Sequence, residues 1–174
     1  MKTLRTERLV VRPFTVDDSA FILTLLNNPS WIQYIGDRGI RTLDEARAYL
    51  LKGPIEMYAR FGFGLCMVEL INDATPIGLC GLIKRDALDD VDIGFAFMPE
   101  FSGKGYGYES AAAVLEYAKD TLGLKRIVAI TTEDNKASLK LLEKLGLTYE
   151  SKVRMPGDDE EILLLSINLD DASR

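Results

Sequence analysis

The feature that constrains this chain most is the run Val91–Ser110, which reads VDIGFAFMPEFSGKGYGYES. Its first part alternates so that Ile93, Phe95 and Phe97 share one face of a strand, and Pro99 ends that strand because proline cannot donate to a β-ladder. Glycines follow at alternate positions, and the apolar residues behind them recur at helical spacing. The run therefore predicts a strand, a glycine-rich turn and a helix in direct succession.

This order of elements is typical of an anion-binding turn. Gly103, Gly105 and Gly107 let the backbone direct its N–H groups at a ligand and let a bulky phosphate approach. The first turn of the next helix leaves more N–H groups unpaired, its dipole adds partial positive charge, and Lys104 adds a full one. The spacing lacks the triphosphate loop GxxxxGK[ST] and fails the dinucleotide fingerprint GxGxxG at its last glycine. From these residues alone, a glycine-rich turn without a ligand stays open.

Three blocks of the sequence resemble one family. SGKGYG resembles the Q/R-x-x-G-x-G/A pyrophosphate loop of the GCN5-related N-acetyltransferases (GNAT), with Ser102 where that family usually has arginine or glutamine, and with Gly105 and Gly107 at the glycine positions. TERLVVR near the N-terminus resembles the T-x-R-L-x-L-R opening of the RimJ/RimL-type branch, and NKAS at 135–138 followed by EKLG resembles its N-x-x-S…E-K-L-G block. Three blocks in the right order are more specific than one glycine loop.

The predicted elements run β α α β β β α β α β β, which is a mixed α/β (α+β) chain. The resemblance implies one acetyltransferase domain over 1–174, with a twisted mixed sheet of about seven strands, flanking helices and a splay between the strands Val91–Met98 and Arg126–Thr132. Gly53-Pro54 predicts a kink or break in the helix that Thr42 caps, with helical turns resuming after it. Residues 170–174 predict a frayed tail.

Acetyl-CoA is the cosubstrate that the resemblance implies, and no metal is implied. Its pyrophosphate would lie on the glycine loop, and its pantetheine arm would add to the open edge of the central strand like an extra strand. The predicted cofactor-binding residues are Phe97, Met98, Ser102, Gly103, Lys104, Gly105, Tyr106, Gly107, Tyr108, Asn135 and Ser138.

The reaction that the resemblance implies is direct transfer of an acetyl group to a primary amine. The chain has no histidine, which removes a histidine base, Ser–His and Cys–His couples and most zinc sites. The base is then a carboxylate, an ordered water or a neutral amine from bulk, and Asp92 is the main candidate, ahead of Glu133 and Glu69. A solvated strand end is the structural alternative for Asp92.

The resemblance assigns the proton for the leaving thiolate to Ser138. Many family members use a tyrosine from this helix, but Leu142 stands in that slot here, and in the RimJ/RimL-type branch a serine takes its part. The structural alternative is a Ser138 hydroxyl bonded back to its own helix turn. An acceptor pocket is expected between the early helices and the late strands, lined by Trp31, Tyr34 and Tyr58, although single aromatics are also common in cores.

Composition narrows the partners. The net charge of −6 argues against nucleic-acid binding by a general basic surface and favours a cationic acceptor such as an amine. No apolar segment is long enough to span a bilayer, and the charged N-terminus does not fit a signal peptide, so a cytoplasmic monomer or homodimer without membrane contact is expected. Cys66 and Cys80 are expected to be buried and reduced.

The sequence leaves the acceptor open among protein N-termini, amino acids, polyamines and aminoglycosides. It also leaves two other functions open. One is a non-catalytic acyl-CoA-binding protein of the same fold, and the other is a nucleotide- or flavin-binding α/β module that uses the same glycine loop.

Overall fold

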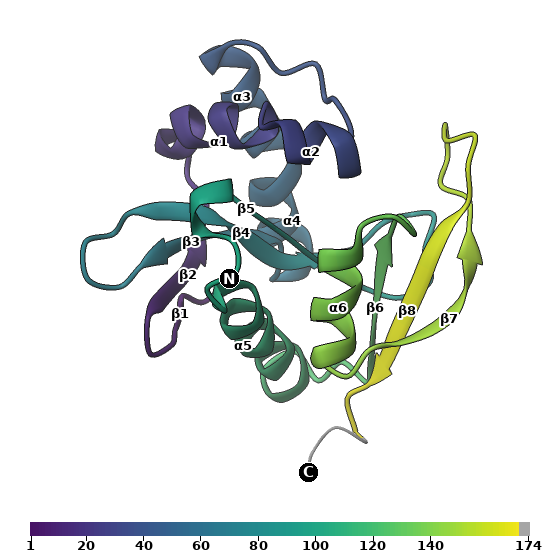
Figure 1. Cartoon of the computed structure of the whole chain (residues 1–174). Coiled ribbons are helices and arrows are strands. Elements are labelled where there is room, and N and C mark those ends of the chain that lie inside the picture. The colour runs from purple at the N-terminus through teal and green to yellow at the C-terminus, as the bar shows by residue number, and fades with distance from the viewer. Residues whose placement is uncertain (171–174) are drawn as a thin grey trace.

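The structure is a computed structural model that describes residues 1–170, so the predicted C-terminal tail, apart from Asp170, lies outside it. One eight-stranded sheet runs through the molecule in the order β1-β2-β3-β4-β5-β6-β8-β7, and β5–β6 is its parallel pair (Figure 1). The strands are Leu4–Arg5 (β1), Leu9–Pro13 (β2), Leu65–Leu70 (β3), Pro76–Ile83 (β4), Asp92–Phe97 (β5), Arg126–Thr131 (β6), Thr148–Val153 (β7) and Ile162–Asn168 (β8). The mixed α/β prediction is confirmed, with one strand more than expected, the two-residue β1.

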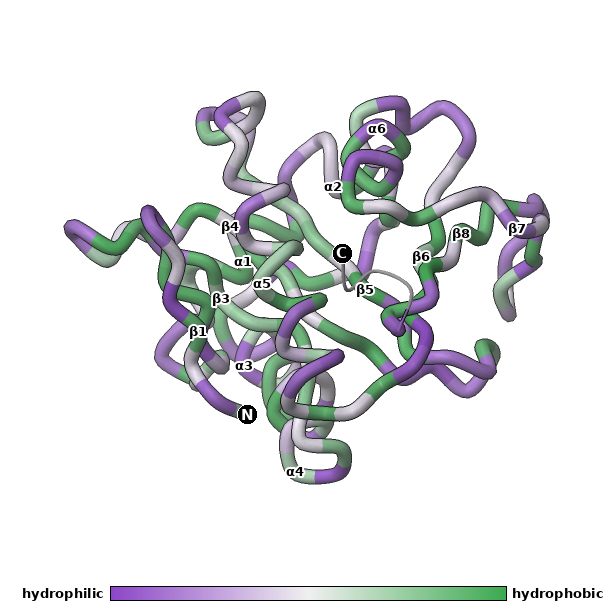
Figure 2. Tube along the Cα trace, turned by 90° about the horizontal axis from the view of Figure 1, so that it is seen from below, coloured by the Kyte–Doolittle hydropathy of each residue, from purple (hydrophilic) through white to green (hydrophobic). Residues whose placement is uncertain are grey.

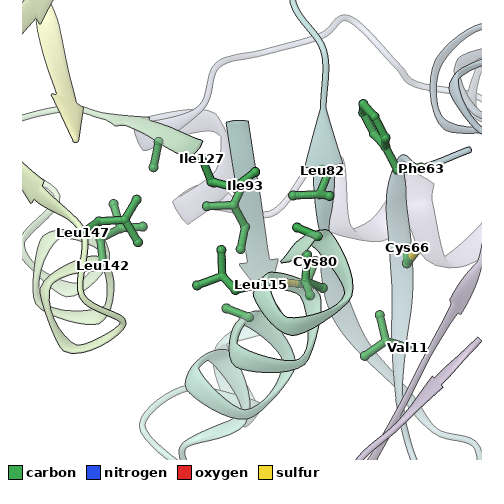
Figure 3. Close-up of a cluster of buried hydrophobic side chains, with 14 of the residues drawn as sticks. Val11, Phe63, Cys66, Cys80, Leu82, Ile93, Leu115, Ile127, Leu142 and Leu147 are labelled. Carbon is green, nitrogen blue, oxygen red and sulfur yellow. The ribbon is translucent and has the colours of Figure 1, made fainter. Parts of the chain in front are cut away.

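The helices cover the two faces of this sheet separately (Figure 1). They are Ser19–Leu26 (α1), Pro29–Tyr34 (α2), Leu43–Leu50 (α3), Glu56–Phe61 (α4), Tyr106–Asp120 (α5) and Lys136–Lys144 (α6). The main buried cluster joins α5 and α6 to the sheet, and it includes Ile93 from β5, Leu115 from α5 and Leu142 from α6 (Figure 3). A second cluster joins α1, α2 and α3 to the opposite face.

Hydropathy follows this layering. The inner strands of the sheet are mostly hydrophobic, whereas the edge strand β7 and many connecting loops are largely hydrophilic (Figure 2). Cys66 and Cys80 are buried free thiols, as predicted, and burial raises the pKa of each to about 12. The last strand, β8, contributes Leu164 to one buried cluster and Leu165 to another, so it is covered on both faces. Within residues 1–170, no helix is both long and apolar enough to cross a membrane.

The helix that Thr42 caps changes its geometry at Gly53-Pro54 but does not break there, and α-helical turns resume after it as predicted. Helix α3 continues through a π-helical segment, Leu51–Ile55, directly into α4. A π-helical turn skips the usual hydrogen bond, so it accommodates a proline that lacks an N–H. The continuous helical segment from α3 to α4 ends at Gly62, whose φ of 78° is the left-handed conformation that often terminates helices.

The sheet opens between its two middle strands. β5 and β6 share the single registered pair Asp92↔Val128, and the Val128 N–H donates to the Val91 carbonyl at 3.0 Å. β5 pairs with β4 along its whole length, whereas β6 pairs onward with β8. The two halves of the sheet therefore diverge toward the carboxyl ends of β5 and β6, which is the splay that the family resemblance implied.

Candidate functional site

The glycine loop follows β5 at the open end of the splay. Gly103 and Gly105 have φ of 73° and 86°, so both take the left-handed conformation that favours glycine. Gly105 is the N-cap of α5, and among the described residues no side chain caps this helix. The N–H groups of Tyr106, Gly107 and Tyr108 therefore have no acceptor within the helix, which makes the turn suitable for an anion.

The third glycine of the loop has a packing role. A Cβ on Gly107 would lie 2.9 Å from Cδ2 of Leu141 on α6 and 3.6 Å from Cε2 of Phe97 at the end of β5. Glycine at this position therefore lets α5, α6 and the end of β5 close on one another.

The loop is tied to the N-terminal corner of the chain. Arg8 donates from Nη1 to the Lys104 carbonyl at 3.0 Å and from Nε to Oε1 of Glu109 at 2.7 Å, and its Cζ lies 4.4 Å from the centre of the Tyr106 ring. The other oxygen of Glu109 accepts from the Thr6 hydroxyl and from the Arg8 backbone N–H at 2.9 Å. The sequence assigned no role to these contacts, although the T-x-R-L block contains two of the residues.

The backbone groups along β5 differ in whether they are free to meet a ligand. The Met98 N–H donates to the Ile77 carbonyl at 2.9 Å, and the Met98 carbonyl accepts from the Phe101 N–H at 3.0 Å. Hydrogen-bonded and non-bonded pairs alternate in an antiparallel ladder, so the N–H groups of Phe97 and Phe95 point away from β4 and into the splay. The Met98 N–H is therefore already bonded, whereas Phe97 and Phe95, which the sequence analysis did not select, each have an N–H that faces the splay.

Polar groups gather at the turn from β6 into α6. Asn135 caps α6, with its Oδ1 accepting from the Ser138 N–H at 3.2 Å. Within residues 1–170, the Ser138 hydroxyl has no hydrogen-bond partner, so it is not bonded back to its own helix turn. The buried Oγ1 of Thr132 also lacks a partner there. Three polar side chains at this turn, Thr132, Asn135 and Ser138, thus retain hydrogen-bonding capacity.

Asp92 is buried rather than solvated, with 1% of its surface exposed. Burial raises the pKa of its carboxyl group, and the charge and hydrogen bond of Arg85, whose Nε lies 3.3 Å from each Asp92 oxygen, oppose that shift only in part. Contact between this carboxylate and an amine needs a bridging water or a movement of the Arg85 side chain. Glu69, a secondary candidate, is paired with Arg12 at 3.2 Å.

The three aromatic residues expected at the acceptor pocket have different environments. The Tyr58 hydroxyl donates to the Leu65 carbonyl and accepts from the Phe14 N–H at 2.9 Å, so it joins backbone segments and has little capacity left for a ligand. Trp31 is 5% exposed, and its Nε1 lacks a partner within residues 1–170. Tyr34 is half-buried at the end of α2.

A concavity of about 480 Å³ lies between α3 and the loop that precedes it. Tyr49 lines it together with Arg38 and Lys52. Burial raises the pKa of the Tyr49 hydroxyl, and the nearby charges of Arg38 and Arg85 oppose this. Tyr49 also packs against the buried cluster of α1–α3, so the concavity lies on the face of the sheet that these helices cover.

Comparison with known proteins gives consistent matches. Residues 8–148 match the family model described as "Acetyltransferase (GNAT) domain". The uncharacterized N-acetyltransferase YnaD of Bacillus subtilis is 28% identical over 147 residues, which are 84% of this chain and 83% of that protein. The FsC-acetyl coenzyme A-N(2)-transacetylase of Aspergillus fumigatus is 36% identical over 154 residues, which are 84% of this chain and 65% of that protein.

Solved structures share the fold over nearly the whole chain. An acetyltransferase from Agrobacterium tumefaciens superposes with a TM-score of 0.82 at 26% identity, covering 97% of this chain and 95% of that one. RimL, a ribosomal-protein alpha-N-acetyltransferase solved in complex with coenzyme A, has the same fold, with a TM-score of 0.81 at 17% identity over 97% and 99% of the two chains. Since the family model spans most of the sequence, the chain belongs to the GNAT acetyltransferase family and is an acetyl-CoA-dependent acyltransferase.

Proposed function

We propose that this chain moves an acetyl group directly from acetyl-CoA to a primary amine. The observation that carries the proposal is the splay: β5 presents unpaired backbone to it, and the uncapped glycine loop lies where β5 ends. The amine nitrogen attacks the thioester carbon, the C–N bond forms and the C–S bond breaks. Holding both reactants in one complex supplies much of the acceleration.

The cofactor is proposed to run along β5. N–H groups from Ser102 to Tyr108 bind the pyrophosphate, and the pantetheine arm pairs with backbone groups of Phe97 and Phe95. This direction takes the thioester toward the start of β5, where Asp92 lies. An N–H of β5 that faces the splay is then placed to polarise the thioester carbonyl. Asn135 would meet the arm from the β6 side, through the side-chain NH₂ that its capping bond leaves unused.

Two residues are proposed to handle the protons. Asp92 takes the proton that the attacking amine loses, and its buried position brings its pKa closer to that of a base that works near neutral pH. Ser138 gives a proton to the departing thiolate and recovers one from solvent. The unpartnered state of its hydroxyl supports this role over the alternative of a bond to its own helix.

Ser138→Ala is expected to lower kcat about tenfold and to leave KM for acetyl-CoA nearly unchanged, because the hydroxyl acts mainly in the transition state. The effect stays modest because the thiolate of coenzyme A is a fairly good leaving group, since a thiol has a pKa of about 8.5. Steady-state kinetics measure both constants. Ser110→Ala is a matched control, because the Ser110 hydroxyl is bonded to the Tyr106 carbonyl at 2.8 Å inside α5. Full kcat in Ser138→Ala would assign the proton to bulk solvent.

The acceptor is proposed to be a primary amine that enters on the side of α1–α3, near Trp31 and Tyr34. The relatives leave its class open, because RimL is named for a ribosomal-protein amine and the Aspergillus enzyme for an N(2) amine. Membership of the RimJ/RimL-type branch rests on the T-x-R-L and N-x-x-S blocks of the sequence.

An acceptor panel tests this function. Peptides with free N-termini, amino acids, polyamines and aminoglycosides are each incubated with acetyl-CoA, and released CoA thiol and acetylated amine are measured together. For one of these acceptor classes, we expect released CoA thiol and acetylated amine to appear in equal amounts. Thiol release without an acetylated amine, or tight binding of acetyl-CoA without any turnover across the panel, would contradict the proposal.

A further inference from the structure

We propose that Arg8, in the corner between β1 and β2, is a positioning residue for acetyl-CoA, because it fixes the glycine loop and neutralises a carboxylate beside it. The inference rests on the proposed function, in which this loop binds the pyrophosphate.

The first part of the argument is geometric. A loop with left-handed glycines at Gly103 and Gly105 has little side-chain packing to hold its conformation, because neither glycine has a neighbour against which to pack a Cβ other than Arg8 itself. The Arg8 guanidinium bridges the loop and the helix, since it donates to the Lys104 carbonyl and to Glu109 on α5. A planar guanidinium with fixed donor directions suits such a bridge, which lysine cannot reproduce.

The second part is electrostatic. Glu109 is in the first turn of α5, next to the N–H groups that would bind phosphate. Partial burial would raise the pKa of Glu109, but hydrogen bonds from Thr6 and Arg8 and the charge of Arg8 outweigh burial and lower it, so the group is a carboxylate at neutral pH. An unpaired carboxylate here would repel the cofactor phosphates. Arg8 cancels that charge.

The third part concerns charge within the loop. Ser102 is neutral where the family usually has arginine or glutamine, which leaves Lys104 as the cation of the loop itself. Arg8 uses Nε and Nη1 for its bridge, and its Nη2 lies 3.2 Å from where a Cβ on Gly105 would be. A third guanidinium nitrogen therefore lies beside the N-cap of α5. Arg8 thus brings a hydrogen-bond donor to the anion site from a distant part of the sequence, while its charge offsets that of Glu109.

The test uses the full chain and acetyl-CoA binding measured by calorimetry. Arg8→Met is expected to weaken acetyl-CoA about tenfold, and in turnover assays the change should fall on KM rather than on kcat, because the phosphates lie away from the reacting atoms. Adding Glu109→Gln to Arg8→Met should recover about threefold of this loss, since it removes the unpaired charge. Arg8→Lys keeps a charge without the bridge and should be intermediate.

Arg12→Met is the matched control. Arg12 lies four residues further along, within β2, and its side chain pairs with Asp18 at 2.9 Å and with Glu69. Within residues 1–170 it has no hydrogen bond or ion pair with the glycine loop. It should lower the melting temperature and keep acetyl-CoA affinity. If the unaltered chain does not bind acetyl-CoA, the proposed function fails. If it does, and a folded Arg8→Met binds equally well, the inference about Arg8 fails; should Arg8→Met not fold, equal affinity in Arg8→Lys overturns it.

Discussion

Gly105→Val is expected to bind acetyl-CoA about thirtyfold more weakly than the unaltered chain, a loss of ~2 kcal/mol. Gly105 has a φ of 86°, which costs a residue with a Cβ roughly 1–2 kcal/mol. The branched side chain would also stand where phosphate and backbone must meet. Its Cβ would lie 3.2 Å from Nη2 of Arg8, so it would disturb the residue that holds the loop. Calorimetric titration with acetyl-CoA measures the loss.

Gly62→Val separates backbone strain from ligand contact. Gly62 closes α4 with a φ of 78°, and a Cβ there would have no neighbour within 4 Å. Both variants should therefore lose a similar amount of stability in thermal unfolding, while only Gly105→Val loses affinity. An unchanged dissociation constant in a folded Gly105→Val would show that the loop does not bind the phosphates.

Asp92→Asn is expected to lower kcat about 100-fold, because the amide cannot accept the proton of the attacking amine. The sign of the pH effect follows from the buried position of Asp92. Its carboxyl group acts as a base only when ionised, and burial raises its pKa, so kcat of the unaltered chain should rise with pH through a value above the ordinary carboxyl range. Asp92→Asn should lose this rise. A pH–rate series on both proteins, with saturating acetyl-CoA and amine, measures it.

Asp90→Asn is the control for this substitution. Asp90 precedes the same strand and is also paired with an arginine, Arg126, at 2.9 Å, but it is about one-third exposed. Asp90→Asn should change neither kcat nor the pH dependence of kcat. Thermal unfolding checks that Asp92→Asn, which leaves Arg85 opposite a neutral amide, remains folded. If folded Asp92→Asn retains kcat and the pH rise, the amine loses its proton to another group.

The strand, loop and helix around 91–110 were predictable because each depends on local sequence, namely alternation, glycine spacing and helical periodicity. The two-residue β1 was not, because alternation needs a longer strand to show. At Gly53-Pro54 the sequence indicated a disturbed helix that resumes, but it did not indicate that the disturbance would be a π-helical segment rather than a break. A proline ends a helix only when the backbone cannot widen, and here the π-helical segment Leu51–Ile55 absorbs it.

The glycine loop of the candidate site was predictable from local sequence. The hydrogen-bond partners that residues find in distant parts of the chain were less predictable. Strand alternation alone indicates that Phe97 and Phe95 share a direction and that Met98 does not, so the difference at Met98 was within reach of the sequence. The contacts of Arg8 were not, because they join residues about one hundred positions apart. The T-x-R-L block drew attention to Arg8, but it did not indicate that Arg8 pairs with Lys104 and Glu109.

Burial explains the remaining differences. A carboxylate at a strand end is usually solvated, and nothing in the sequence around Asp92 indicates that Arg85 pairs with it inside the protein. Tyr58 was expected in the acceptor pocket for its aromatic ring, but its hydroxyl joins Phe14 to Leu65. Its ring also packs against Gly64, where a Cβ would lie 2.6 Å from it. These environments depend on tertiary contacts, which a local pattern does not specify.

Amide hydrogen exchange with and without coenzyme A tests the central claim most directly, that the cofactor arm pairs with β5 inside the splay. The account predicts that coenzyme A slows exchange at the N–H groups of Phe95 and Phe97 and at those of the first turn of α5, Tyr106–Tyr108. It predicts no change at Met98, whose N–H is already bonded to Ile77. Protection of the glycine loop without protection at Phe95 and Phe97 would contradict the account.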